Sequence, residues 1–451
     1  MAHQKSSTGC LTRRDFLART SATAAGLLGA AAFDQAGSLF STAEAAARIT
    51  LRFGMYSSPT WVPSYQQIFK NFMKAHPTIM VKPEWAPYAA WTQKISTELA
   101  SGTVPDVSIL DWDDFYDRTS KGSVMPLDNF LKDDPVPLDN FYSPALDWYR
   151  YNGKLYGLPF NSATTLFYYN KTLFDKAGMR YPDASWTWND VVGAARKLTK
   201  KGKNGRTAQW GLLVPEFIDL MNGPLWSAGG TGLVDDSYTK PGINDSIGVK
   251  TLQFFYDLIY KEKVAPNPAA LLGLALPFAS GKIAMHPVGP TWEVYSYRSV
   301  TNFKWDVTYM PLDSTTKKRI TPLFPNAFSI AANTKHPKEA YALVKFLTDP
   351  VQSNSSIKLE AGYGSLNPIK WLPETHLFLG GARDLPAHWT YFFTNLRYAK
   401  IIPHKQGFRE WRTKADKTYQ LMLSGHITPR QAADQIAKII TGVIGGSSNA
   451  P

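Results

Sequence analysis

The sequence predicts an α/β protein, because strand-like and helix-like segments alternate along the first part of the chain. Residues 49–55 alternate apolar and polar side chains, and residues 79–81 and 107–110 are short apolar runs typical of buried strands. Helical spacing of apolar residues separates these runs. We therefore expect a mainly parallel sheet with helices on both faces. With 451 residues, of which 44% are apolar, the chain is long enough for two or three domains.

The helices expected between these strands have recognisable faces and ends. Tyr65 and Phe69 belong to the apolar face of the first helix, and Trp91 and Ile95 to that of the second. Gly102 follows the second helix, where a left-handed residue commonly ends a helix. Further along, the sequence predicts these elements: a capping box at Thr187 and Asp190, a strand at 210–214, a helix at 247–260, a helix at 337–347 and a last helix beginning at Pro429.

A tight turn followed by an extended segment predicts a passage between two lobes. Asn152 and Gly153 readily take positive φ values, so they favour a reversal between two short strands. Pro159 donates no hydrogen bond, and residues 164–169 are β-branched and aromatic, so the chain is expected to leave one sheet and enter another here. We interpret this segment as a hinge. Two further extended segments share its Pro, Gly and Asn punctuation: residues 323–330 and 362–368.

The first 45 residues predict an export signal. Residues 12–17 resemble the twin-arginine signature, and residues 21–33 form an uncharged Ala/Gly-rich stretch. That stretch is shorter than the roughly 18–20 apolar residues a spanning helix needs. Small residues at 43–45 offer a cleavage site, so we expect cleavage near Ala45 and a periplasmic location. The single cysteine, Cys10, would be removed with the signal, leaving no disulfide and no thiol nucleophile.

Composition and motifs exclude several function classes. The 49 basic and 36 acidic residues give a net charge of +13, but the basic residues are scattered, which favours a solvated surface over an anionic ligand or attraction to a membrane surface, and no nucleic-acid partner is expected. The chain has no Gly-x-Ser-x-Gly, phosphate-loop or His-Glu-x-x-His motif. Its eight histidines lack the spacing of metal ligands. The sequence therefore predicts neither catalysis, nor a cofactor, nor a metal.

Three acidic residues follow the strand at 107–110. Asp111, Asp113 and Asp114 could belong to a calcium site or to a glycosidase carboxylate pair, or they could be acids at a helix N-terminus. Asp111 differs from the other two because it stands at the carboxyl end of a parallel strand, where open α/β sheets bind ligands.

The order and spacing of several short motifs resemble the sugar-binding proteins of ABC importers, the broad group that includes maltose-binding protein. The resemblance runs from about residue 48 to 445 and is carried by residues 105–106, 152–159, 169–171, 186–190, 228–230, 278–285, 289–290 and 424–425. It implies a type II periplasmic-binding-protein fold, with two α/β lobes, three hinge crossovers and a ligand cleft between the lobes. The implied boundaries are 1–45 for the signal, 46–160 plus 327–364 for the N-terminal lobe, and 161–326 plus 365–451 for the C-terminal lobe.

The resemblance also implies a function. The mature chain would be a non-catalytic, monomeric binding protein that captures a mono- or oligosaccharide by lobe closure and delivers it to membrane permease subunits. Two alternatives stay open. The positive charge, together with Arg397, Lys405, Arg409 and Arg412 near Trp411, favours an anionic ligand such as a uronate oligomer or a glycerol phosphate. A secreted polysaccharide-degrading enzyme would use Asp111 with a second carboxylate.

The resemblance places a set of residues at the cleft. Indole rings would cover the apolar faces of a sugar, and Asp or Asn side chains would bind its hydroxyls. For each tryptophan, core packing is the alternative that the sequence leaves open. Pro325 and Asn326, and the pair at 367–368, depart from the pattern of similar proteins, which affects the identity of the ligand. The expected ligand-binding residues are Tyr56, Ser58, Asp111, Trp112, Asn161, Trp226, Gly229, Gly230, Trp292, Asn326 and Trp411.

Overall fold

A computed structural model describes residues 48–56, 62–274, 276–297, 299–349 and 386–444. The predicted export signal, Ser58 and the expected crossing at 362–368 lie outside these residues. Within the described part of the chain, no helix combines the length and the apolar character needed to cross a membrane.

A six-stranded sheet forms the first half of the fold. Its order is β13-β12-β3-β1-β2, and β6 also pairs with β12. β1 runs parallel to β2 and β3, which confirms the parallel pairing expected for the first three strands, whereas β12 runs antiparallel to β3 and β6. The strands are β1 (Ile49–Tyr56), β2 (Ile79–Ala86), β3 (Val107–Leu110), β6 (Leu158–Ala163), β12 (Thr321–Ile330) and β13 (Ala399–Ile401).

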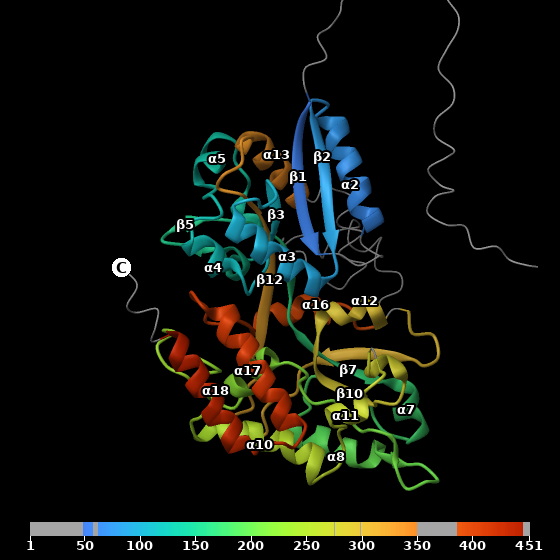
Figure 1. The fold of residues 1–451 in the computed structure, drawn as a ribbon. Helices are drawn as coiled ribbons and strands as arrows, with labels where there is room; N and C mark the ends of the chain where they lie inside the picture. The colour runs from blue at the N-terminus through green and yellow to red at the C-terminus, as the bar shows by residue number, and fades with distance from the viewer. Residues whose placement is uncertain (1–47, 57–61, 275, 298, 350–385, 445–451) are drawn as a thin grey trace, which may run out of the picture. The chain divides into compact units, whose positions relative to one another are not determined.

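The helices predicted between these strands are present. α2 buries Tyr65 and Phe69, and α3 buries Trp91 and Ile95. α3 stops at Gly102, whose φ of 68° is left-handed, as the sequence predicts. Figure 1 shows α2 beside β1 and β2. The helical elements of this half are α2 (Val62–Ala75), α3 (Tyr88–Ser101), α4 (Phe115–Ser120), α5 (Asp128–Asp133), η1 (Leu138–Asn140), α6 (Ser143–Trp148) and α13 (Pro337–Thr348).

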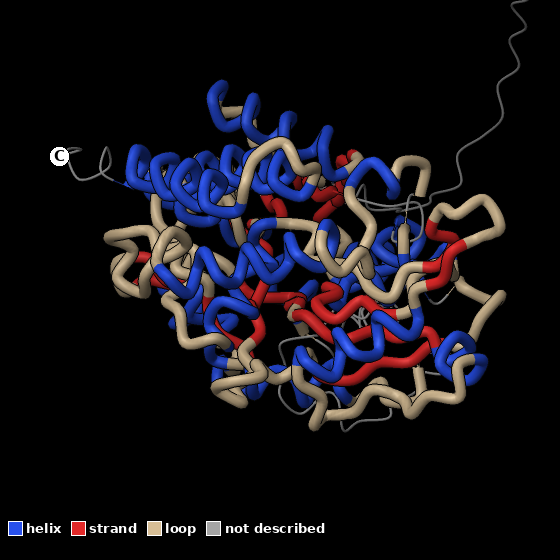
Figure 2. Tube along the Cα trace, turned by 90° about the horizontal axis from the view of Figure 1, so that it is seen from below, coloured by secondary structure: helices blue, strands red, loops and turns tan. Residues whose placement is uncertain are grey.

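The second half is built on a smaller sheet of order β10-β7-β11, with β10 (Met285–Pro290), β7 (Thr165–Asn170) and β11 (Trp305–Tyr309). Both of its pairings are antiparallel, so the expectation of a mainly parallel arrangement is wrong for this sheet. Figure 2 shows strands flanked by helices. The remaining elements are α7 (Lys171–Lys176), α8 (Trp188–Leu198), η2 (Ile218–Met221), α9 (Asn222–Ser227), α10 (Ser246–Tyr260), α11 (Pro268–Leu271), η3 (Phe278–Ser280), η4 (Thr291–Glu293), α12 (Val294–Tyr297), α16 (Tyr391–Thr394), η6 (Asn395–Tyr398), α17 (Phe408–Leu423) and α18 (Pro429–Ile444).

The described residues contain two small hairpins, and the first was predicted from the sequence. Asn152 and Gly153 have φ values of 49° and 78° and connect β4 (Arg150–Tyr151) to β5 (Lys154–Leu155), which confirms the predicted reversal. The capping box of Thr187 and Asp190 is also present at the start of α8. The other hairpin joins β8 (Lys200–Lys201) to β9 (Thr207–Gln209).

The strand predicted at residues 210–214 is wrong. Trp210 forms only an isolated bridge with Ile283, and Gly211 and Leu212 direct their N–H groups to the carbonyl of Val264 instead. Apolar runs of this length occur in buried loops as well as in strands, and periodicity does not separate the two.

The chain passes from one sheet to the other at the two described crossings. β6 belongs to the six-stranded sheet, and β7, which follows it after one residue, belongs to the three-stranded sheet. β12 is the second crossing, and it extends from β3 toward the other half in Figure 1. The two crossings are joined where Thr165 donates its N–H to the Thr321 hydroxyl over 2.8 Å. This is a two-lobed α/β fold.

Candidate ligand-binding site

Strand register brings three of the expected ligand-binding residues together. Ala327 of β12 lies opposite Leu110 of β3, so Asn326 lies beside Asp111, the residue after β3. On the other edge of β12, Asn326 pairs directly with Asn161 of β6. The polar side chains of three separate strand segments therefore meet at one point of the six-stranded sheet.

The amide of Asn326 connects the members of this group. Its nitrogen faces Asp111 Oδ1 at 2.6 Å, and its oxygen accepts from the Tyr56 hydroxyl at 3.2 Å. This orientation follows from the chemistry, because a carboxylate oxygen only accepts hydrogen bonds. The Oδ1 atom of Asn161 lies 3.0 Å from the same oxygen, and turning the Asn161 amide in the same way would place a donor there. Tyr56, Asp111 and Asn326 thus form one hydrogen-bonded group with Asn161 in contact with it, and the four residues are called the polar cluster below.

Asp111 carries the electrostatic character of the polar cluster. Its side chain is only 2% exposed, and Oδ1 also accepts from the N–H of Trp112 over 3.0 Å. The other oxygen, Oδ2, is buried with no hydrogen-bond partner among the described residues. Burial raises the pKa of Asp111, and the negative charge of Asp113 raises it further, whereas Arg409 lowers it. A donor reaching Oδ2 would relieve the cost of this buried acceptor.

The hydroxyl of Tyr149 holds the backbone of the polar cluster in position. Its hydroxyl donates to the carbonyl of Pro325 over 2.6 Å and lies 3.1 Å from the carbonyl of Leu110. These carbonyls belong to the residues just before Asn326 and Asp111. The phenol therefore ties β12 to the end of β3 next to the polar cluster.

Tyr88 is a neighbour of the polar cluster that the sequence reasoning missed. Its ring lies 5.1 Å from that of Tyr56 in an edge-to-face contact, and 44% of the residue is exposed. The negative charge of Asp111 raises the pKa of Tyr88, followed by burial. An exposed aromatic residue directly after Pro87, at the start of α3, is the signal that could have identified it.

Two expected tryptophans lie on either side of one phenylalanine. The ring of Phe324 is 5.0 Å from Trp112 and 5.4 Å from Trp292. The guanidinium of Arg412 lies 4.9 Å above the Trp112 ring, and Trp112 itself is 8% exposed. Trp292 is partly exposed and lies in η4, two residues after the end of β10. Trp292 therefore offers more surface to a ligand than Trp112.

The other two expected tryptophans are packed inside the protein. Trp226 is 2% exposed and donates from Nε1 to the carbonyl of Thr231 over 3.0 Å. Trp411 has no exposed surface and donates from Nε1 to the Tyr238 hydroxyl over 2.6 Å. The core alternative left open by the sequence describes both residues in this structure, and we leave them out of the proposed site.

Gly229 and Gly230 shape the turn after Trp226. Gly229 has a φ of 93°, which favours glycine. A Cβ on Gly230 would lie 3.1 Å from both Ile247 Cγ2 and the Leu225 carbonyl. The backbone conformation therefore accounts for glycine at position 229, and crowding accounts for it at position 230, without any ligand contact.

A buried ionic network lies next to the polar cluster. Arg412 Nε lies 2.5 Å from Asp219 Oδ2, and Arg412 Nη1 lies 3.2 Å from Asp113 Oδ2. Arg409 forms a second ion pair with Asp113 and lies 3.6 Å from Asp114 Oδ2. Burial raises the pKa of Asp219 to about 6, although Arg412 opposes this. Arg409 and Arg412, two of the four basic residues that favoured an anionic ligand, are thus already paired with carboxylates.

The fold and this site define a two-lobed binding protein. The chain belongs to the bacterial extracellular solute-binding protein family, whose model matches residues 58–353. It is 26% identical to a binding protein of Brucella abortus, over 84% of this chain and 88% of that one. It is 25% identical to the arabinooligosaccharide-binding protein of Bacillus subtilis, over 68% of this chain and 70% of that one.

A solved structure agrees with the family assignment. An ABC substrate-binding protein from Listeria monocytogenes in complex with cycloalternan is similar with a TM-score of 0.80 and 25% identity, covering 88% of this chain and 99% of that chain. The predicted type II periplasmic-binding-protein fold is confirmed by this similarity and by the family match. The individual ligand contacts and the lobe boundaries stay predictions.

Proposed function

We propose that this chain is the non-catalytic substrate-binding component of an ABC importer and that it captures a carbohydrate. The observation that carries the proposal is the buried Asp111 Oδ2, which has no hydrogen-bond partner among the described residues. The other oxygen of the same carboxylate, Oδ1, contacts the amide nitrogen of Asn326. A sugar hydroxyl can donate to the carboxylate and accept from an amide, so this group suits the polar edge of a sugar.

Aromatic surface next to the polar cluster supports the same ligand class. Tyr88 and Trp292 both keep exposed ring surface. Sugars present apolar C–H faces, which pack on such rings. The arabinooligosaccharide-binding relative and the cycloalternan-bound neighbour favour an oligosaccharide over a monosaccharide.

The alternative of an anionic ligand has less support. Arg409 and Arg412 are already engaged by Asp113 and Asp219, which leaves less cationic charge for a uronate or a phosphate. Asp111 would also repel an anion. The enzyme alternative lacks support too, because Asp113, a carboxylate near Asp111, is held by two arginines.

The mechanism follows from a ligand that contacts both lobes only when they are closed. Such a ligand stabilises the closed form, and a permease that distinguishes closed from open then receives the loaded protein. Export by the twin-arginine route with cleavage near Ala45 would place the monomeric chain in the periplasm, where it meets the membrane permease subunits. N-terminal sequencing of the exported protein, and loss of export when Arg13 and Arg14 are both changed to lysine, test this part.

Thermal unfolding and calorimetric titration of the chain beginning at residue 46 test the binding function. The panel should include arabino-, galacto- and gluco-oligosaccharides, their monosaccharides, polyols and uronate oligomers. We expect at least one neutral oligosaccharide to stabilise the protein by about 2.7 kcal/mol at a hundredfold excess over Kd. Binding should change little in high salt, whereas an anionic ligand would lose affinity. No stabilisation by any member of the panel would contradict the proposal.

A further inference from the structure

Three ionisable side chains converge in the second half of the fold, away from the polar cluster. Glu216 lies in the loop between β9 and η2, His286 lies in β10, and Glu293 ends η4. One potential ligand atom from each lies within 4.8 Å of the others. The group contains a single histidine, and Glu216 lies far from it in the sequence, which explains why histidine spacing alone predicted no metal site.

His286 is the centre of this group. Its side chain is completely buried, and its Nε2 has no hydrogen-bond partner among the described residues. Nε2 faces Glu216 Oε2 at 4.0 Å, while Nδ1 lies 3.4 Å from Glu293 Oε2. The Tyr297 hydroxyl bonds to Glu293 and lies 3.4 Å from Nδ1, so Glu293 and the imidazole are held in place.

The gap between His286 and Glu216 is suited to an ion. A separation of 4.0 Å is too long for a hydrogen bond. Zinc bonds of about 2.0–2.2 Å at tetrahedral angles place two ligand atoms roughly 3.3–3.6 Å apart, so a shift of about half an ångström would let both atoms bind one ion. Two carboxylates beside a buried imidazole also leave negative charge uncompensated. Burial and then the charge of Glu293 raise the pKa of Glu216 to about 7. A bound cation would offset both the burial of the Glu216 carboxylate and its repulsion by Glu293.

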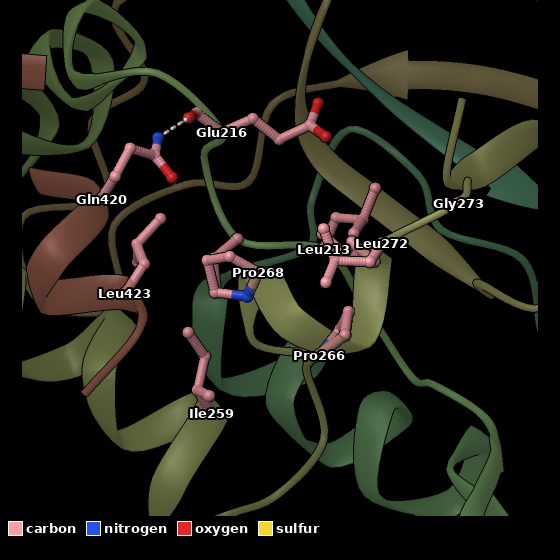
Figure 3. Close-up of a pocket in the computed structure, with 11 residues that line it drawn as sticks. Leu213, Glu216, Ile259, Pro266, Pro268, Leu272, Gly273, Gln420 and Leu423 are labelled. Carbon is pink, nitrogen blue, oxygen red and sulfur yellow. Dashed lines mark hydrogen bonds between the residues drawn. The ribbon is translucent and has the colours of Figure 1, made fainter. Parts of the chain in front are cut away.

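A pocket provides access to Glu216. It has a volume of about 270 Å³ and is lined mostly by apolar residues, among them Leu213, Leu271 and Leu272. Figure 3 shows Glu216 at its edge, with Gln420 bonded to the main-chain oxygen and the carboxylate pointing away from Gln420. Solvent or an ion entering the pocket therefore meets a carboxylate that is 22% exposed.

We propose that Glu216, His286 and Glu293 form a binding site for a divalent transition-metal ion such as Zn²⁺. One imidazole nitrogen and two carboxylates are a ligand set that zinc accepts, with water completing the tetrahedron. Calcium and magnesium prefer oxygen ligands alone, so the imidazole selects against them. The site lies in the second half of the fold, and Glu293 directly follows Trp292 of the proposed carbohydrate site.

Zinc titration of the chain beginning at residue 46, purified without a histidine tag and treated with a chelator, tests the proposal. We expect one equivalent of Zn²⁺ to bind in competition with a chromogenic chelator and to raise the Tm, while Ca²⁺ and Mg²⁺ do neither. Glu216→Gln and His286→Gln should each weaken Zn²⁺ binding by about tenfold or more. His388→Gln is the matched control, because His388 pairs with one carboxylate, Asp306, and its side chain is 55% exposed.

Three outcomes would overturn the proposal: no Zn²⁺ binding by the unmodified chain, unchanged binding in Glu216→Gln, or an equal loss in His388→Gln. The last two would mean adventitious zinc only. Circular dichroism will show whether His286→Gln folds. If it does not, Zn²⁺ binding by Glu216→Gln and Glu293→Gln decides the result, because Glu216 is partly exposed.

Discussion

Asn326 and Asp111 lie side by side on β12 and at the end of β3, with the Asn326 amide nitrogen 2.6 Å from Asp111 Oδ1. This contact satisfies one carboxylate oxygen and leaves Oδ2 buried without a partner among the described residues. The pairing of Ala327 with Leu110 creates the contact, so the geometry of the site is a property of the sheet.

Asp111→Asn should separate binding from stability. The substitution removes a charge-assisted hydrogen bond to the ligand, worth about 1.5–3 kcal/mol, so we expect roughly 10- to 100-fold weaker carbohydrate binding by calorimetry. The stability at neutral pH should not fall, because burial raises the pKa of Asp111 and its charge is therefore costly in the folded state. Asp434→Asn, in an exposed ion pair with Arg430, is the control. Equal affinities of the two variants would exclude Asp111 from the site.

Trp292 and Trp411 should respond in opposite ways to substitution. Trp292→Ala removes a partly exposed ring near Trp112 and Phe324, so we expect a clear loss of affinity and a modest loss of stability. Trp411→Phe removes the donor to Tyr238 from the core, which should lower the free energy of unfolding by about 1–3 kcal/mol and leave affinity unchanged. Urea unfolding and titration of both variants provide the test, and weaker binding by Trp411→Phe alone would reverse the assignment.

The different positions of these tryptophans show which features of the site could be predicted from the sequence and which could not. Strand periodicity and the carboxyl-end rule pointed to Asp111, because these features depend on local pattern and sheet topology, whereas Asn161 and Asn326 were predicted from the resemblance to sugar-binding proteins. Whether an indole faces a ligand or the core depends on contacts made much later in the chain. The bond from Trp411 to Tyr238 spans 173 positions, and no local pattern in the sequence records it.

The ion-pair partners of two arginines were equally impossible to predict from the sequence. Arg409 and Arg412 are one turn apart on α17, and their spacing predicts a basic face. Their partners Asp113 and Asp219 come from distant segments, so the sequence could not reveal that the charges are neutralised.

Arg412→Met should be strongly destabilising. It leaves Asp113 and Asp219 with less compensation in a buried position, and breaking a buried ion pair typically costs about 3–5 kcal/mol. Arg430→Met breaks only an exposed pair with Asp434 and should cost less than about 1 kcal/mol. Urea denaturation of both variants measures the difference. A similar small effect for both would mean that Arg412 is not needed to balance these carboxylates.

His404 should make the protein sensitive to mild acid. The ring stacks on Trp148 at 4.1 Å, and burial lowers its pKa from 6.5 to about 4. As the pH falls below 6.5, His404 becomes protonated in the unfolded chain but stays neutral in the folded chain. The free energy of unfolding therefore decreases as the pH falls toward 4. Between pH 7 and pH 5 this contributes a loss of about 2 kcal/mol.

His404→Gln should abolish that part of the acid sensitivity. Unfolding free energies of the two proteins, measured from pH 7 to pH 5, should differ by an amount that changes by about 2 kcal/mol over the range. His426→Gln serves as the control. A difference that stays constant with pH would show that His404 gains its proton equally in both states.

Pro159→Gly tests whether the β6 crossing is a mechanical pivot. Pro159 lies opposite Ala327 in the pairing of β6 with β12, two residues before Asn161, so it connects the crossing to the polar cluster. Glycine removes the fixed φ and gives the strand more freedom, which should change the balance of open and closed forms and the apparent affinity together. Small-angle scattering with and without ligand, combined with calorimetry, measures both. Pro137→Gly, at an exposed position before η1, controls for the general cost of losing a proline. Unchanged solution shape and affinity in Pro159→Gly would place the pivot elsewhere, most directly at Thr165 and Thr321, where the two crossing strands are bonded to each other.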